Sequence, residues 1–156
     1  MALEPEAVET LSPVVRRITA NNPGVFTGPG TNTYLIGSGD VTVIDPGPAM
    51  DTHTQAIVDA PGTITQIIVT HTHLDHSPGT QLLQERLGVP AYGRVATSPR
   101  NQDTTFTPTA LLEDQQVIEG EDFRLKVIHT PGHASNHLCF LMEPQGMLFS
   151  GDHIMN

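Results

Sequence analysis

One short stretch limits what this chain can fold into more than any other, because it carries three histidines and an aspartate within six residues. It reads HTHLDH at residues 71–76 and follows an apolar run at residues 67–69. In an extended segment, residues i and i+2 point to the same side, so His71 and His73 can bind one metal ion together. Asp75 and His76 lie at the bend into a following helix and can face a second ion. Histidines that only cap a strand occur singly, so we predict a metal site here.

The composition describes one globular domain with a sizeable core, since the chain has 156 residues and 37% hydrophobic content. Acidic residues outnumber basic ones 17 to 7, which gives a formal net charge of -10 and disfavours a broad surface for nucleic acid or anionic membranes. No stretch approaches the length of a membrane span, and the start lacks the features of a signal peptide. Cys139 is the only cysteine, so an intrachain disulfide is impossible. We therefore expect a cytoplasmic protein.

The segments before and after the motif predict an α/β chain. Residues 1–12 are expected to form a flexible acidic arm, and residues 13–156 a single domain that opens with an edge strand at 14–18. Strands at 41–44 and 67–70, joined by a helix at about 50–60, predict a parallel pair with a right-handed crossover. A second helix is expected to have Ser77 as its N-cap and Pro78 as its first residue, and to stop at Gly88. The histidine motif then lies at the carboxyl end of a parallel strand, where open α/β sheets bind ligands.

The second half of the chain predicts a long loop followed by a meander of short strands. Residues 94–109 lack periodicity and are rich in polar and turn residues, so we expect a loop that borders the site. Short strands are predicted at 116–118, 123–128, 137–142 and 147–149. Cys139 lies in the third of these strands and is interpreted as a buried, inert thiol.

Three other strand ends carry side chains that can complete a metal site. The strand that ends near residue 128 is followed by a Pro-Gly turn with His129 on one side and His133 on the other, and we favour His133 because it projects beyond the sheet. Asp152 follows the strand at 147–149 in the same way. Asp45 ends the strand beside the motif and can accept a hydrogen bond from a ligand histidine, although a plain turn residue is the alternative.

Residues that could contact a substrate lie near these strand ends. The glycine-rich segment at 28–37 is not a phosphate loop, because it lacks the Gly-Lys-Ser/Thr sequence and a third correctly spaced glycine. It is better interpreted as a tight corner with Asn32 and Tyr34 facing the site. His137 and His153 are further candidates for substrate contact, with structural roles as the alternative.

The ordered motifs resemble the signature of the metallo-β-lactamase fold superfamily. HTHLDH at 71–76 is followed by Thr-Pro-Gly-His at 130–133 and Gly-Asp at 151–152, and Asp45-x-Gly47 resembles the early structural turn of that superfamily. The resemblance implies a metallo-β-lactamase-like αββα sandwich. It further implies the following ligands: His71, His73 and His133 for a first metal, Asp75 and His76 for a second, and Asp152 as the bridge between them.

Details of the motifs indicate a branch of the superfamily. Metallo-β-lactamases usually have a cysteine where Asp152 stands, so the chain is more similar to the hydroxyacylglutathione hydrolase and lactamase-like endoribonuclease branches. The resemblance implies a zinc-dependent hydrolase of an ester, thioester, lactone, lactam or phosphodiester, with Asp75 as the catalytic residue. Two Zn²⁺ sites are expected, and Mn²⁺ or Fe²⁺ suit these ligands less well. A small-molecule substrate is expected, and RNA is disfavoured by the acidic charge. An iron-dependent oxidoreductase similar to the persulfide dioxygenases, and a non-catalytic metal-binding fragment, are the alternatives.

The superfamily completes its second metal site with a histidine well downstream of the bridging aspartate, whereas Asn156 is only four residues past Asp152. We therefore expect a truncated C-terminal half, an incomplete second site and weak activity. We also expect the second sheet to expose Leu138, Phe140, Met147 and Phe149, and to allow self-association through its open face.

Overall fold

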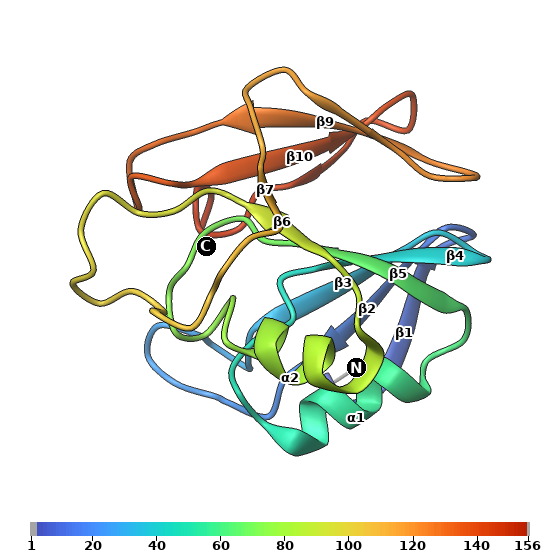
Figure 1. Cartoon of the computed structure of the whole chain (residues 1–156). Coiled ribbons are helices and arrows are strands. Elements are labelled where there is room, and N and C mark those ends of the chain that lie inside the picture. Colours follow the sequence, from blue (N-terminus) through green and yellow to red (C-terminus); the bar gives the residue numbers. More distant parts are fainter. Residues whose placement is uncertain (1–2, 156) are drawn as a thin grey trace.

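The computed structural model describes residues 3–155, which form two β-sheets and two helices (Figure 1). The larger sheet contains, in spatial order, β1 (Val8–Ser12), β2 (Val15–Thr19), β3 (Asn32–Ile36), β4 (Asp40–Ile44), β5 (Thr63–Ile68), β6 (Ala91–Gly93) and β7 (Ala110–Leu111). The smaller sheet contains β11 (Met147–Phe149), β10 (Leu138–Met142), β9 (Arg124–His129) and β8 (Val117–Glu119). Helices α1 (Asp51–Asp59) and α2 (Gly79–Leu87) cover the face of the larger sheet that is turned away from the smaller one.

The larger sheet changes from antiparallel to parallel pairing at β4. Strands β1 to β4 pair antiparallel, whereas β4, β5, β6 and β7 pair parallel. The predicted parallel unit of strand, helix and strand is therefore confirmed. Because β4 and β5 run in the same direction, Asp45 and the histidine motif leave the sheet at the same edge.

The core has two layers, one on each face of the larger sheet. Between the two sheets lie Ile44 and Ile68 from one side and Leu125 and Phe140 from the other, all of them buried. Between the larger sheet and the helices lie apolar residues such as Ile57 of α1 and Leu83 of α2. This arrangement of helices, larger sheet and smaller sheet corresponds to three layers of the expected αββα sandwich. Within residues 3–155, the outer face of the smaller sheet carries no helix.

The expectation that the second sheet exposes its large apolar side chains is wrong. Leu138 and Phe140 have no exposed surface and Phe149 is 5% exposed, while Met147 is partly buried against the same cluster. Side chains alternate between the two faces of a strand, and these point inward to the larger sheet. Leu148, which points the other way, is 45% exposed.

Two local expectations also differ from the structure. Residues Val8–Ser12, placed in a flexible arm by their composition, form the edge strand β1 and pair with β2. Four of these five residues are exposed, so the strand depends on backbone hydrogen bonds and has little apolar pattern to reveal it. Helix α2 begins after Pro78 without a side-chain cap, because the Ser77 hydroxyl donates instead to Asp103 Oδ2 at 2.7 Å. Residues 1 and 2 of the expected arm lie outside the described residues.

Gly88 ends α2 in the left-handed conformation, with φ of 66° and its N–H donating to Gln84 O at 2.8 Å. Replacing Gly88 with alanine is expected to lower the free energy of unfolding by about 1 kcal/mol, since Cβ disfavours this conformation. Gly132→Ala is the matched control, because nothing lies within 4 Å of the added Cβ and its φ is not positive. Urea unfolding of both variants measures the difference. Equal losses would contradict the conformational explanation.

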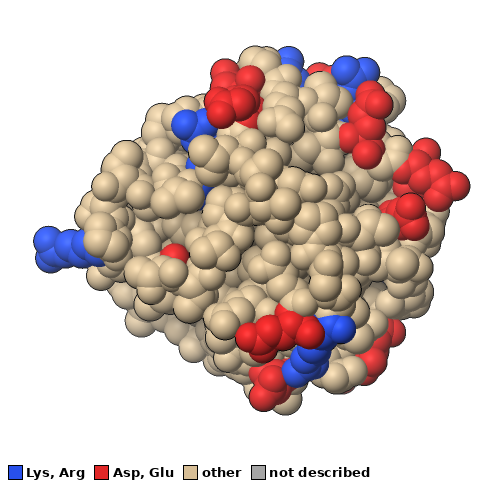
Figure 2. Space-filling view, viewed as in Figure 1, with Lys and Arg blue, Asp and Glu red and all other residues tan. Residues whose placement is uncertain are grey.

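The surface agrees with the acidic composition. Figure 2 shows one face, on which acidic and basic groups lie mainly around the rim and uncharged residues form most of the middle. Residues 3–155 form no continuous basic surface on this face. Neither of the two helices in this part of the chain is long and apolar enough to cross a membrane.

Candidate metal centre

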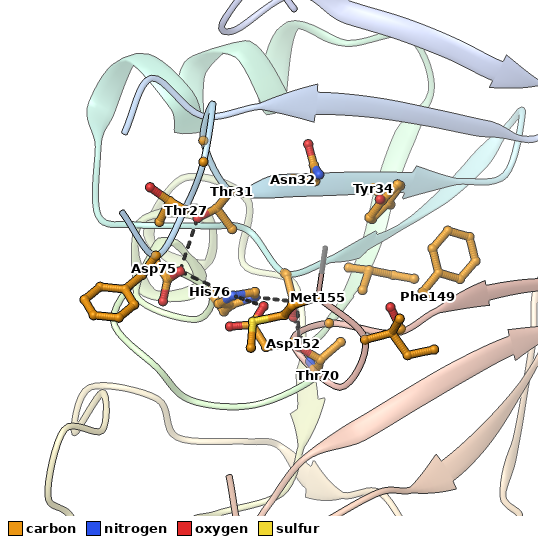
Figure 3. Close-up of a pocket in the computed structure, with 18 of the residues that line it drawn as sticks. Thr27, Thr31, Asn32, Tyr34, Thr70, Asp75, His76, Phe149, Asp152 and Met155 are labelled. Carbon is orange, nitrogen blue, oxygen red and sulfur yellow. Dashed lines mark hydrogen bonds and ion pairs between the residues drawn. The ribbon is translucent and has the colours of Figure 1, made fainter. Parts of the chain in front are cut away.

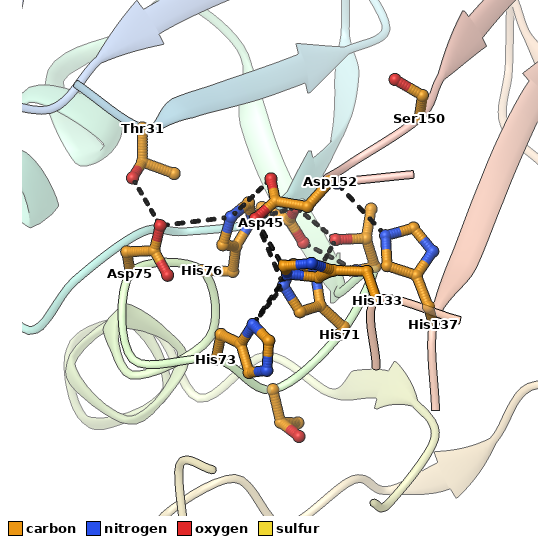
Figure 4. A network of polar contacts seen from close by, with 12 residues as sticks. Thr31, Asp45, His71, His73, Asp75, His76, His133, His137, Ser150 and Asp152 are labelled. Atoms are coloured by element: carbon orange, nitrogen blue, oxygen red, sulfur yellow. Dashed lines mark hydrogen bonds and ion pairs between the residues drawn. The ribbon is translucent and has the colours of Figure 1, made fainter. Parts of the chain in front are cut away.

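The polar residues selected from the sequence converge at one end of the two sheets (Figure 4). The loop after β5 carries residues 71–76, and the turn after β4 carries Asp45. The connection between β9 and β10 supplies His133, and the turn after β11 supplies Asp152. These strand ends are far apart in the chain, and the packing of the two sheets brings them together.

The first ligand group consists of His71, His73, His133 and Asp152, whose potential ligand atoms all lie within 4.8 Å of one another. His73 Nδ1 is 3.1 Å from His71 Nε2 and 3.0 Å from His133 Nε2. Asp152 Oδ2 is 3.2 Å from His133 Nε2 and 3.8 Å from His71 Nε2. A tetrahedral zinc site with Zn–N bonds of about 2.0–2.1 Å has ligand atoms about 3.3 Å apart. The donor types and their spacing therefore fit one zinc ion.

The second ligand group consists of Asp75, His76 and Asp152. His76 Nε2 lies 3.2 Å from Asp152 Oδ1 and 3.4 Å from Asp75 Oδ2. Asp152 thus directs Oδ2 to the first group and Oδ1 to the second. One carboxylate shared in this way can bridge two metal ions.

A buried aspartate orients one histidine of each group. Asp45 Oδ2 is 2.9 Å from His76 Nδ1, and it also accepts the Thr70 hydroxyl at 2.6 Å. Thr70 Oγ1 lies 2.9 Å from His71 Nδ1. Because the hydroxyl has a single proton, which it gives to Asp45, His71 must donate from Nδ1 and keeps Nε2 free for a metal. Asp45 therefore favours the ligand tautomer of both histidines.

Burial keeps two histidines of the first group in the neutral form. It lowers the pKa of both His71 and His73, and neighbouring histidines add to the effect. Their imidazoles are therefore neutral near pH 7, which is the form that binds a metal.

Charge dominates in the second group. Burial opposes protonation of His76, but hydrogen bonds to Asp152, Asp45 and Asp75 raise its pKa well above the usual value. Burial likewise opposes ionisation of Asp75 and Asp152, but the hydrogen bond from His76, the positive charge of His76 and smaller contributions together lower the pKa of both carboxyl groups. A cation is thus favoured between these carboxylates, and a metal ion has to displace the His76 proton.

The remaining candidates lie at different distances from the ligand groups. His129 contacts the Ser135 carbonyl at 3.4 Å and belongs to neither group. His153 is exposed beside His137, with ring centroids 5.9 Å apart. His137 has no exposed surface, and burial lowers its pKa to about 4. It therefore lies behind the ligands, away from any position where it could meet a substrate.

A cavity of about 620 Å³ adjoins the second ligand group (Figure 3). Asp75, His76 and Asp152 line it together with the predicted Asn32 and Tyr34. Apolar side chains also line the cavity, namely Ile44, Phe149, Val25, Phe26, Leu148, Ile154 and Met155. The cavity can therefore receive a molecule with a polar end beside the carboxylates and an apolar remainder.

Sequence reasoning missed two threonines that contact the site. Thr70 links Asp45 to His71, and Thr31 donates to Asp75 Oδ2 at 3.4 Å. Alternation does not point to Thr31, because the predicted Asn32 and Tyr34 would place its side chain on the other side of the chain. A threonine directly before a ligand histidine, as in Thr70, offers no sequence signal either.

Some known proteins resemble this chain in sequence, and others resemble it in fold. The sequence profile of the metallo-beta-lactamase superfamily matches residues 26–156. The atrochrysone carboxyl ACP thioesterase dmxR1 of Cryptosporiopsis sp. (strain 8999) is 33% identical over 156 residues, which cover 95% of this chain and 46% of that protein. The atrochrysone carboxyl ACP thioesterase of Aspergillus terreus (strain NIH 2624 / FGSC A1156) is 31% identical over 158 residues, with coverages of 95% and 46%. The chain spans about half the length of the curated relatives it matches.

Among solved structures, native FEZ-1 metallo-beta-lactamase from Legionella gormanii superposes with a TM-score of 0.74. The match covers 100% of this chain and 67% of that protein at 14% identity. At this level of identity, the likeness concerns the fold alone.

Proposed function

Because the chain belongs to the metallo-beta-lactamase superfamily, we propose that it is a metal-dependent hydrolase that holds two zinc ions and cleaves a thioester. A thioester is the substrate class that the names of two relatives, both atrochrysone carboxyl ACP thioesterases, indicate. A cavity with polar and apolar walls beside the ligand groups supports an acyl substrate.

The observation that carries the proposal is the position of Asp152 between the two ligand groups. Its two oxygens lie 3.2 Å from His133 Nε2 and 3.2 Å from His76 Nε2. A site for one ion needs only the first group, so the second group favours a two-ion hydrolase over the mononuclear oxidoreductase. When bound, such ions lower the pKa of water to near 7 and stabilise negative charge that develops on a carbonyl oxygen.

The residues of the chain supply orientation and proton transfer. Asp75 is a carboxylate at neutral pH, so it can accept a proton from attacking water and return it to the leaving thiolate. The Thr31 hydroxyl and the His76 ring both lie 3.4 Å from Asp75 Oδ2 and restrict the rotation of the carboxylate. His71 and His76 are held in the ligand tautomer by Asp45, directly or through Thr70.

The proposal is tested on metal-free protein by zinc titration and by hydrolysis of a short acyl-coenzyme A. We expect one tightly bound zinc ion at the four-residue first group and a second, more weakly bound ion at the three-residue second group. We also expect weak thioester cleavage that a chelator abolishes and zinc restores. The oxygen ester of the same acyl group serves as the comparison substrate. A single tightly bound iron together with oxygen consumption would instead support the oxidoreductase and refute a two-zinc hydrolase.

A further inference from the structure

We propose that His137 is a positioning residue that holds the shared carboxylate Asp152 in place and thereby sets the zinc affinity of both ligand groups. The inference rests on the proposed function, since it assumes that these groups bind zinc. It concerns a histidine that lies outside both groups and has no exposed surface.

The hydrogen bonds of His137 define its tautomer. Its Nε2 lies 3.2 Å from the backbone nitrogen of Asp152. A backbone N–H can only donate, so Nε2 accepts this hydrogen bond and carries no proton. The proton is then on Nδ1, which lies 2.8 Å from Thr130 Oγ1 and donates to it. Both ring nitrogens are occupied, so the ring is fixed in one orientation.

The backbone around His137 is held just as firmly. The Thr130 N–H donates to the His137 carbonyl at 3.0 Å, which extends the pairing of β9 and β10 by one step. The next residue, Leu138, donates to the Thr70 carbonyl at 2.7 Å, directly before the histidine motif. The His137 ring also packs against the His71 ring, with centroids 4.9 Å apart. His137 is thus tied to the same frame that carries the first ligand group.

The turn that carries Asp152 brings its backbone close to the His137 ring. Gly151 has φ of 50°, and a Cβ at that position would lie 2.8 Å from His137 Nε2 and 2.7 Å from Thr70 Oγ1. Only a glycine lets the backbone approach the ring closely enough for the next N–H to reach Nε2. With its backbone fixed there, Asp152 places one oxygen 3.2 Å from His133 and the other 3.2 Å from His76.

The test is a calorimetric zinc titration of metal-free protein carrying His137→Phe, which keeps a ring of similar size and removes the acceptor. Because Asp152 belongs to both groups, we expect both zinc ions to bind about 10–100-fold more weakly. His137→Gln restores an acceptor and is expected to recover part of the affinity. His129→Phe is the control, since that ring contacts neither ligand group, and its zinc affinities should equal those of the unsubstituted protein.

Thermal unfolding of the metal-free variants separates positioning from a general loss of stability. If His137→Phe does not fold, Gly151→Ala tests the same contact from the other side and should weaken both ions similarly. Normal zinc affinities in folded His137→Phe or Gly151→Ala protein would overturn the positioning role while leaving the proposed function intact. Failure of the unsubstituted protein to bind zinc would overturn both.

Discussion

Asp75→Asn is expected to abolish most of the hydrolysis while leaving the fold in place. The amide keeps the shape of the side chain but can neither accept a proton nor supply a negative ligand to the second group. Loss of a positioned acid–base group typically lowers kcat by about 10²–10⁴-fold. The Asp75 side chain is 29% exposed, so its ion pair with His76 contributes about 1 kcal/mol or less to stability.

The measurement pairs kcat for thioester hydrolysis with the melting temperature. A loss of about 1 kcal/mol shifts the melting temperature of a domain this size by about 2–4 °C. Asp59→Asn, at an exposed position on α1, is the control and should change neither quantity. Hydrolysis by Asp75→Asn at the parental rate would rule out the catalytic role of Asp75.

His71→Ala is expected to remove at least one of two bound zinc ions. His71 is fully buried in the first ligand group, and its Nε2 lies 3.1 Å from His73 Nδ1. Its replacement removes one of the three imidazoles of the first group and leaves His73, His133 and the carboxylate shared with the second group, so zinc should bind there more weakly. Zinc content after dialysis, measured by elemental analysis, gives the number of ions retained per chain.

His129→Ala is the matched comparison, because the sequence offers His129 as the alternative to His133. Its ring contacts the Ser135 carbonyl and belongs to neither ligand group, so zinc content should stay at the parental value. Equal zinc losses in the two variants would show that the first ligand group has been assigned to the wrong histidines.

Local sequence patterns were sufficient to predict the elements around the centre. Apolar β-branched runs predicted the strands, and the order of strand, helix and strand predicted the parallel pairing of β4 with β5. The short spacing within HTHLDH predicted that His71 and His73 lie side by side. In the structure, His71 Nε2 and His73 Nδ1 are 3.1 Å apart. These features were accessible because each depends on residues close together in the chain.

Tertiary structure decided the contacts between distant segments. Asp45 and His76 are 31 residues apart, and His73 and His133 are 60 residues apart, so only the packing of the two sheets shows that they meet. The same packing buries Phe140 between the sheets. It also lets the Ser77 hydroxyl donate to Asp103 instead of capping α2, and it places the His137 ring where it accepts the Asp152 N–H. A periodic pattern shows that one face of a strand is buried but not which partner buries it. Hydrogen bonds that orient a ligand depend on ångström-scale positions, which the folded chain alone determines.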